Sequence, residues 1–103
     1  MRHLWLAALC VLSLLAPSLA QAQGPCVRDA LNQKVCLAEP AQRIVSLSPG
    51  ATELLFSAGA GEKVVAVSAW SDYPPEAENL PQVGDSNRLD LEAIVSLAPD
   101  LVV

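Results

Sequence analysis

From residue 43 onward, the chain alternates short apolar runs with stretches of helical periodicity. The run Ile44-Val45-Ser46-Leu47 predicts a strand, and Val64-Val65-Ala66-Val67 predicts a second. Both are apolar on consecutive residues, as expected when the two faces of a parallel sheet are covered. Leu101 to Val103 predicts a third strand. The order strand, helix, strand, loop, helix, strand predicts an α/β fold with a doubly wound parallel sheet.

Two helices are predicted between these strands. The first runs from about Pro49 to Ala58, with Ser48 as its cap and Gly59 as a left-handed stop. The second is capped by Asp90 and ends at Pro99. The apolar positions expected to form the buried faces are Ala51, Leu54, Leu55 and Ala58 in the first helix and Leu91, Ile94, Val95 and Ala98 in the second.

Two further segments lack helical periodicity. Residues 68–88 contain Pro74, Pro75 and Pro81 and predict a long loop, with one helical turn around Glu76 to Asn79. Residues 23–42 offer two extended runs, Cys26 to Ala30 and Lys34 to Ala38, which predict a β-hairpin segment ahead of the α/β segment at 43–103.

The first 22 residues have the pattern of a secretory signal peptide. Arg2 and His3 form the positive end, Leu4 to Leu15 the apolar core, and Ala20-Gln21-Ala22 the small-residue exit. A membrane anchor is the alternative, but the uninterrupted apolar run from Leu4 to Leu12 is too short to span a bilayer. We expect export to the periplasm, with no membrane insertion after cleavage behind Ala22.

Removing that segment changes the chemistry of the 103-residue chain, because its one histidine, His3, lies there. The remaining residues therefore exclude a Ser-His-Asp or Cys-His catalytic arrangement and a histidine-based zinc site. Five Lys and Arg face eleven Asp and Glu with no basic cluster, which argues against a nucleic-acid partner. Cys26 and Cys36 remain as an even pair and predict a disulfide in an oxidising compartment.

Candidate binding residues follow the first two strands, because open parallel sheets bind ligands beyond the carboxyl ends of their strands. Ser48, Pro49 and Gly50 follow the first strand, and the segment Ala69 to Pro75 follows the second. In the latter, Trp70 and Tyr73 offer flat faces to a large planar ligand, the alternative being that they pack over the sheet edge. The Ser48 segment lacks the glycines and lysine of a phosphate loop.

Acidic residues give no catalytic pattern. Glu53, Asp72, Asp85 and Asp90 have no histidine or nucleophile to support them, so we expect solvated or capping acids. We also expect no metal site, since Cys26 and Cys36 lack the close spacing of a metal knuckle. Asp100 to Val103 opens a strand with no turn after it, which favours a piece of a longer protein.

Several motifs, in order and spacing, resemble the amino-terminal lobe of the periplasmic substrate-binding proteins for cobalamin and iron complexes. The resemblance covers nearly all of residues 26–103. The matching stretches are Arg43 to Pro49, Ala51 to Leu55, Ser71 to Pro75, Val83 to Asp85, Leu91 to Ile94 and Ala98 to Val102. It implies a partial amino-terminal lobe of a two-lobed binding protein, preceded by the hairpin.

The resemblance also implies a function without catalysis and without a cofactor. The expected ligand is cobalamin or a related corrinoid, delivered to the permease of an ABC importer. Trp70 falls where cobalamin binders place an aromatic against the ligand, and Ser86 falls where a second aromatic is known in the family. Glu92 falls on the carboxylate that docks on permease arginines.

Two other functions stay open. Haem carriers of the same family use a tyrosine ligand, and although this chain has Asp85 where some of them have tyrosine, Tyr73 remains. A haem or iron-siderophore carrier is therefore the alternative ligand class. An α/β hydrolase fragment is a third possibility, against which the missing histidine argues.

Overall fold

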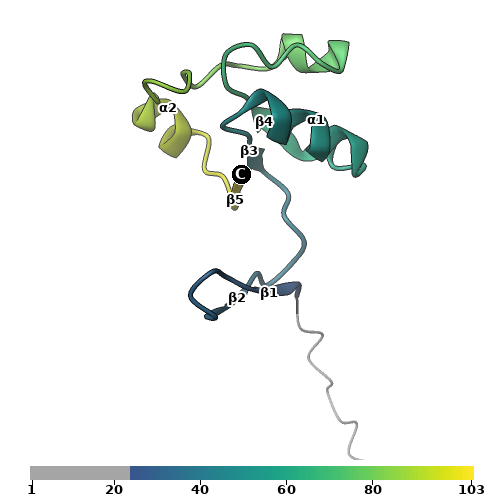
Figure 1. Ribbon diagram of the computed structural model, residues 1–103, viewed down its shortest axis with the longest axis vertical. Helices are drawn as coiled ribbons and strands as arrows, with labels where there is room; N and C mark the ends of the chain where they lie inside the picture. The colour runs from purple at the N-terminus through teal and green to yellow at the C-terminus, as the bar shows by residue number, and fades with distance from the viewer. Residues whose placement is uncertain (1–23) are drawn as a thin grey trace, which may run out of the picture.

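The computed structural model describes residues 24–103, which form a hairpin and an α/β lobe (Figure 1). The predicted signal peptide lies outside the described residues. Within residues 24–103, no helix has the length and apolar character needed to cross a membrane. The strands are β1 (Cys26–Arg28), β2 (Lys34–Cys36), β3 (Ile44–Val45), β4 (Val64–Ala66) and β5 (Leu101–Val102), and the helices are α1 (Pro49–Ser57), η1 (Gly61–Lys63), η2 (Pro75–Asn79) and α2 (Leu91–Ser96).

The predicted hairpin is present and is closed by the predicted disulfide. β1 and β2 pair antiparallel with Cys26 opposite Cys36, and the two sulfurs are bonded. Asp29 forms the turn: its carboxylate accepts hydrogen bonds from the Leu31 and Gln33 N–H groups at 2.9 and 2.8 Å. Asn32 takes the left-handed conformation that such a turn requires, with φ of 60°. All strand residues of the hairpin are exposed, so covalent and local bonds hold it together.

The lobe is built on a parallel sheet of order β4-β3-β5, with β3 in the centre. Ile44 pairs with Val64 on one side and with Leu101 on the other. The ladder continues past β3, because Ser46 N–H donates to the Ala66 carbonyl at 3.0 Å and Leu47 N–H to the Val103 carbonyl at 2.7 Å. The backbone hydrogen bonds thus extend over the whole predicted strand, Ile44 to Leu47, although β3 itself covers only Ile44–Val45.

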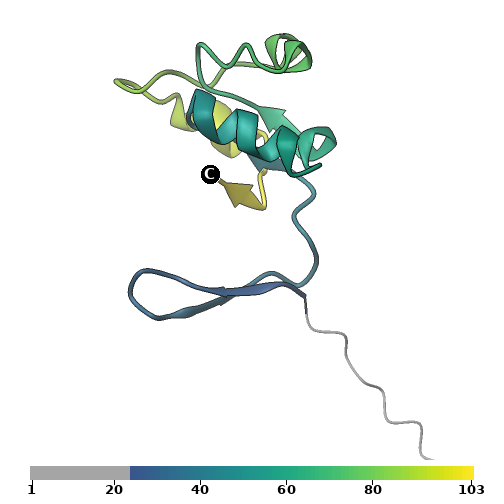
Figure 2. The same ribbon diagram turned by 45° about the vertical axis from the view of Figure 1, so that its right-hand side comes forward.

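The two faces of the sheet carry separate apolar clusters, and each holds one helix (Figure 2). Ile44 packs with Val64 and Val67 against Leu55 and Phe56 of α1. Its neighbour Val45 points to the other face, where Ala66, Val83 and Ile94 of α2 join it. Because consecutive residues of β3 bury against different helices, the doubly wound arrangement predicted from the sequence is confirmed.

Helix α1 has the predicted ends but not the predicted buried face. Ser48 caps it, accepting a hydrogen bond from the Ala51 N–H at 3.2 Å, and Gly59 follows with a φ of 83°. Leu54, expected in the core, is 72% exposed, whereas Thr52 is fully buried. The prediction for Leu54 was wrong because the helix turns Thr52, Leu55 and Phe56 toward the sheet, which leaves Leu54 on the outer side.

Helix α2 also has its predicted cap, but it buries other residues than those predicted. Its cap is Asp90 as predicted, with the Ala93 N–H donating at 3.0 Å. The helix ends earlier, at Ser96, and Ala98 lies outside it with a φ of 47°. The buried face consists of Ala93, Ile94 and Leu97, so the expectation that Leu91 and Val95 are buried was wrong.

The long loop between β4 and α2 has more structure than its sequence predicts. The helical turn expected near Glu76 is present as η2. Beyond it, Val67 forms a parallel bridge with Gln82, and the Val83 N–H donates to the Val67 carbonyl at 2.9 Å. Val83 is buried in the core beside Val45. The loop therefore adds a short piece of chain to the β4 edge of the sheet.

Candidate ligand-binding site

Three segments meet where β3 and β4 end. The first contains the start of α1, the second the loop around Trp70, and the third the loop around Gly84. Thr52 of α1 donates from Oγ1 to the Ser71 Oγ at 3.1 Å, and Ala69 N–H donates to the Gly84 carbonyl at 2.7 Å. The segments that follow β3 and β4 are thus neighbours in space, at the edge where parallel sheets bind ligands.

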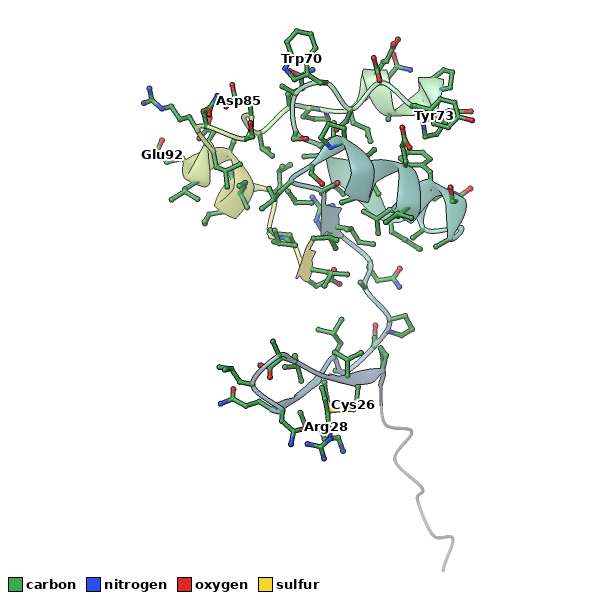
Figure 3. All side chains as sticks on the ribbon, viewed as in Figure 1. Cys26, Arg28, Trp70, Tyr73, Asp85 and Glu92 are labelled. Atoms are coloured by element: carbon green, nitrogen blue, oxygen red, sulfur yellow. A yellow bond between two sulfur atoms is a disulfide. The ribbon has the colours of Figure 1, made fainter. Side chains whose placement is uncertain are left out.

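Trp70 stands out from this edge in an uncommon backbone conformation. Its side chain is 80% exposed and projects away from the lobe (Figure 3). It occupies the third position of a turn closed by the Ser71 N–H and the Ser68 carbonyl at 3.4 Å. Its φ is 68°, a value that glycine or asparagine usually supplies at this position. A large aromatic held here presents its flat face to solvent rather than to the core.

Ser48, Pro49 and Gly50 lie at the start of α1. The Ser48 hydroxyl is used in capping the helix, and all three residues are exposed. A Cβ atom at Gly50 would meet no atom outside the backbone of its own helix within 4 Å, so the space beside Gly50 is open. A ligand-binding role for these three residues stays a prediction.

Tyr73 lies beside a hollow that Trp70 does not line. Together with Phe56, Ser57, Pro74 and Glu76 it lines a shallow cavity of about 350 Å³ at the end of α1. In Figure 3, Tyr73 lies on one side of Trp70, and Asp85 and Glu92 lie on the other. The structure therefore offers the two predicted aromatics on separate surfaces.

The loop after Gly84 carries Ser86 at an exposed turn. Asp85 organises this turn: its Oδ1 accepts from the N–H groups of Asn87 and Arg88 at 2.8 and 2.9 Å. Asp90 likewise accepts from the backbone at the start of α2, so both carboxylates make the capping bonds expected of such acids. Because Gly84 is bonded to Ala69, Ser86 belongs to the loop next to that of Trp70.

Glu92 lies in the first turn of α2, and its side chain is exposed. It lines a concave surface of about 640 Å³ between α2 and the preceding loop, together with Gln82, Gly84, Arg88, Leu89, Asp90 and Leu91. Its neighbour Leu91 is exposed as well. Its docking role stays a prediction.

Sequence reasoning missed a buried cluster of hydroxyl groups beneath Trp70. Its members are Ser46, Thr52, Ser68 and Ser71, each at most 5% exposed. The Oγ1 of Thr52 lies 2.8 Å from the Ser46 Oγ and 3.1 Å from the Ser71 Oγ, which lies 3.1 Å from the Ser68 Oγ. The signal was a serine directly after each apolar run, Ser46 after Val45 and Ser68 after Val67.

The described residues hold no group of three or more His, Cys, Asp or Glu side chains placed to share a metal ion. In the same part of the chain, every buried side-chain nitrogen and oxygen has a hydrogen-bond partner. The polar chemistry of the site thus resides in exposed groups and in the satisfied hydroxyl cluster.

This chain belongs to the periplasmic binding protein family, whose model matches residues 44–103. That family consists of binding proteins, not enzymes, and works in the periplasm, in agreement with the expected localisation and lack of catalysis. The molecule carried by such a protein is its transported ligand rather than a cofactor.

Similarity to individual proteins is concentrated in the same segment. The chain is 55% identical over 62 residues to the vitamin B12-binding protein of Pectobacterium carotovorum, covering 60% of this chain and 22% of that one. Among solved structures, the periplasmic vitamin B12 binding protein BtuF of Vibrio cholerae matches with 51% identity and a TM-score of 0.60, over 61% of this chain and 25% of that one.

A haem-binding protein is nearly as similar. The periplasmic haem-binding protein RhuT of Roseiflexus sp. matches with 48% identity and a TM-score of 0.56, over 60% of this chain and 24% of that one. The chain therefore spans about a quarter of the length of the relatives it matches. Both ligand classes occur among proteins that share this lobe.

Proposed function

We propose that the chain forms part of the substrate-binding component of an ABC importer, and that its ligand is cobalamin or a related corrinoid. The observation that carries this proposal is Trp70, an indole exposed at 80% on a turn at the ligand-binding edge of the sheet. A corrinoid is large and has an apolar face on which an aromatic ring can pack. The two vitamin B12-binding relatives support this choice of ligand.

One open surface buries only part of a large ligand, so we expect the 103-residue chain alone to bind cobalamin weakly. The test therefore uses a chimera in which residues 44–103 replace the matching segment of the Vibrio cholerae protein. Calorimetry should show cobalamin binding by this chimera. Tight haem binding with no cobalamin binding would overturn the corrinoid proposal.

Trp70→Ala in the chimera tests the residue that carries the proposal. We expect a loss of about 1–3 kcal/mol in the free energy of cobalamin binding, the range for a buried aromatic contact. Trp70→Phe keeps a flat face and should lose less. Equal affinity of the parent and the Trp70→Ala chimera would remove Trp70 from the site.

Haem is the second candidate ligand, and Tyr73 favours it. Its side chain is 63% exposed, so the phenol is accessible to an iron centre. A haem carrier predicts that Tyr73→Phe changes the visible spectrum of the haem complex and weakens it. A corrinoid carrier predicts that the same variant leaves cobalamin affinity nearly unchanged, because Tyr73 lies in a separate hollow from Trp70.

Export and delivery complete the proposal. Residues 1–22 would be removed as a signal peptide, leaving the hairpin segment at 23–42 and the lobe segment at 43–103. Mass spectrometry of exported protein should then find Gln23 at the amino terminus; retention of residues 1–22 would contradict it. Glu92, exposed on α2, is proposed as the carboxylate that meets a permease arginine, in a charge-assisted pair that fixes orientation.

A further inference from the structure

The turn that carries Trp70 needs support, because its backbone conformation is unfavourable for the residue it holds. A φ of 68° costs a residue with a Cβ more than it costs glycine, and the cost persists only where the surroundings impose the conformation. The single backbone bond of the turn, from Ser71 N–H to the Ser68 carbonyl, is long at 3.4 Å. Something else must hold the turn.

The buried hydroxyl cluster supplies that support. Ser68 and Ser71 are the first and last residues of the turn. Their Oγ atoms lie 3.1 Å apart, and this hydrogen bond joins the two ends of the turn. Thr52 then donates to the Ser71 Oγ at 3.1 Å, which ties the turn to α1. Thr52 is fully buried, while Trp70, one residue before Ser71, is exposed.

The cluster also reaches the central strand. Ser46, directly after β3, has its Oγ 2.8 Å from the Thr52 Oγ1, and Ser46 donates this bond because the single hydroxyl proton of Thr52 is directed at Ser71. A chain of buried hydroxyls thus runs from β3 through α1 to the turn, in an environment where hydrogen bonds are strengthened and unpaired groups are costly. Moving the turn would take the Ser71 hydroxyl away from both Ser68 and Thr52, and Thr52 would then turn to the Ser48 carbonyl, which lies 3.1 Å from its Oγ1.

We infer that Thr52 is a positioning residue, and that through Ser71 it holds Trp70 in the left-handed conformation that presents its indole at the binding edge. This inference goes beyond the proposed function, since it concerns the conformation of Trp70 whatever the ligand is. Its consequence for cobalamin affinity rests on the proposed function and is tested separately.

The first test measures coupling between Thr52 and residue 70 in the full chain, without ligand. Thr52→Val keeps the shape of the side chain and removes the hydroxyl, and Trp70→Gly removes the need for support. If Thr52 holds a strained Trp70, the shift in the urea midpoint caused by Thr52→Val should fall by about half in the Trp70→Gly background. Equal shifts in both backgrounds would overturn the inference.

Two controls accompany this cycle. Ser96→Ala removes a hydroxyl bonded to the Ala93 carbonyl at the far end of α2, and its effect should add to that of Trp70→Gly. Thr52→Ser retains the hydroxyl and should restore the coupling. If Thr52→Val abolishes cooperative unfolding, Ser71→Ala takes its place, because it removes the same bond from the other side.

A second readout follows the indole directly. The chain has two tryptophans, Trp5 and Trp70, so a Trp5→Phe background leaves Trp70 as the fluorophore. Thr52→Val should lower the residual fluorescence anisotropy of Trp70, and Thr52→Ser should restore it. Unchanged anisotropy in Thr52→Val would contradict the inference.

The third readout is cobalamin affinity in the chimera. Thr52→Val should weaken binding about tenfold at a temperature where the variant is fully folded, and Thr52→Ser should restore it. If the parent chimera does not bind cobalamin, the proposed function fails while the coupling and anisotropy tests still decide the role of Thr52. Full affinity in a binding-competent Thr52→Val chimera would overturn the positioning role.

Discussion

Asp100 and Arg43 bond to each other in both directions across the start of the sheet. The Arg43 N–H donates to the Asp100 Oδ1 at 2.8 Å, and the Asp100 N–H donates to the Arg43 carbonyl at 3.0 Å. The second carboxylate oxygen accepts from the Gln42 N–H at 2.8 Å. The Asp100 side chain thus holds the start of β5 beside the start of β3. This matters because an edge strand makes few hydrophobic contacts.

Asp100→Asn should therefore lower the thermal unfolding midpoint by a few degrees at neutral pH. Backbone N–H groups of Gln42 and Arg43 lower the pKa of Asp100 below its usual 3.8, so its contribution to stability is present above that pH and is lost as pH falls through the lowered pKa. The difference between parent and variant should shrink in acid. Glu78→Gln, on η2, is the control; a difference independent of pH would contradict the role of the charge.

Gly84→Ala should destabilise the lobe by about 1–3 kcal/mol. Gly84 has a φ of 114°, and a Cβ there would overlap the Arg88 carbonyl. Gly50→Ala is the matched control, because its Cβ would enter open space within α1, and we expect it to be neutral or stabilising by up to about 1 kcal/mol. Urea unfolding measures the stability of the two variants. Equal changes in the free energy of unfolding would show that the Gly84 conformation is not required.

Replacing Cys26 and Cys36 by serine should loosen the hairpin without unfolding the lobe. The crosslink spans ten residues and removes about 3 kcal/mol of unfolded-chain freedom in the loop-entropy model. Hairpin side chains are exposed, so no core replaces the lost bond. Hydrogen exchange should accelerate in β1 and β2 and stay unchanged at Val45. Equal loss of protection in the hairpin and at Val45 would mean that the hairpin stabilises the lobe.

In a full-length protein that delivers its ligand to the permease, Glu92→Arg should leave corrinoid affinity nearly unchanged and reduce ATP-driven uptake. The exposed carboxylate on α2 lies apart from Trp70 (Figure 3), so under the proposed docking role the charge change should affect docking and not ligand contact. An opposite charge change on the permease should restore part of the uptake. Glu78→Arg on η2 is the control, and uptake equal to the parent's would leave Glu92 a solvated acid.

Local signals in the sequence predict the elements of this fold well. The caps at Ser48 and Asp90 and the left-handed Gly59 depend on nearest neighbours, so the sequence alone locates both ends of α1 and the start of α2, whereas α2 ends earlier than predicted. The rotation of each helix about its axis depends on the sheet, and this is why Leu54 and Val95 were expected in the core but are exposed.

The candidate site was predictable only in outline. The strand-end rule locates Trp70 at the binding edge, but its left-handed backbone carries no sequence signal, because glycine would be expected there. The hydroxyl cluster was not predicted either, because serines that follow Val45 and Val67 do not by themselves show which side chains they meet. Thr52 and Ser71 are nineteen residues apart and meet only after the sheet and α1 have formed.

The position of β3 at the centre of the sheet also shapes how the lobe folds. Its partner β4 is twenty residues along the chain (Ile44 to Val64), whereas β5 is fifty-seven residues away (Ile44 to Leu101). Closing the longer loop costs more chain entropy, so the β3–β5 pairing should form after β3, α1 and β4 have assembled. Until β5 joins the sheet, one edge of β3 therefore stays unpaired, and this edge is available to any chaperone or neighbouring chain that recognises extended backbone.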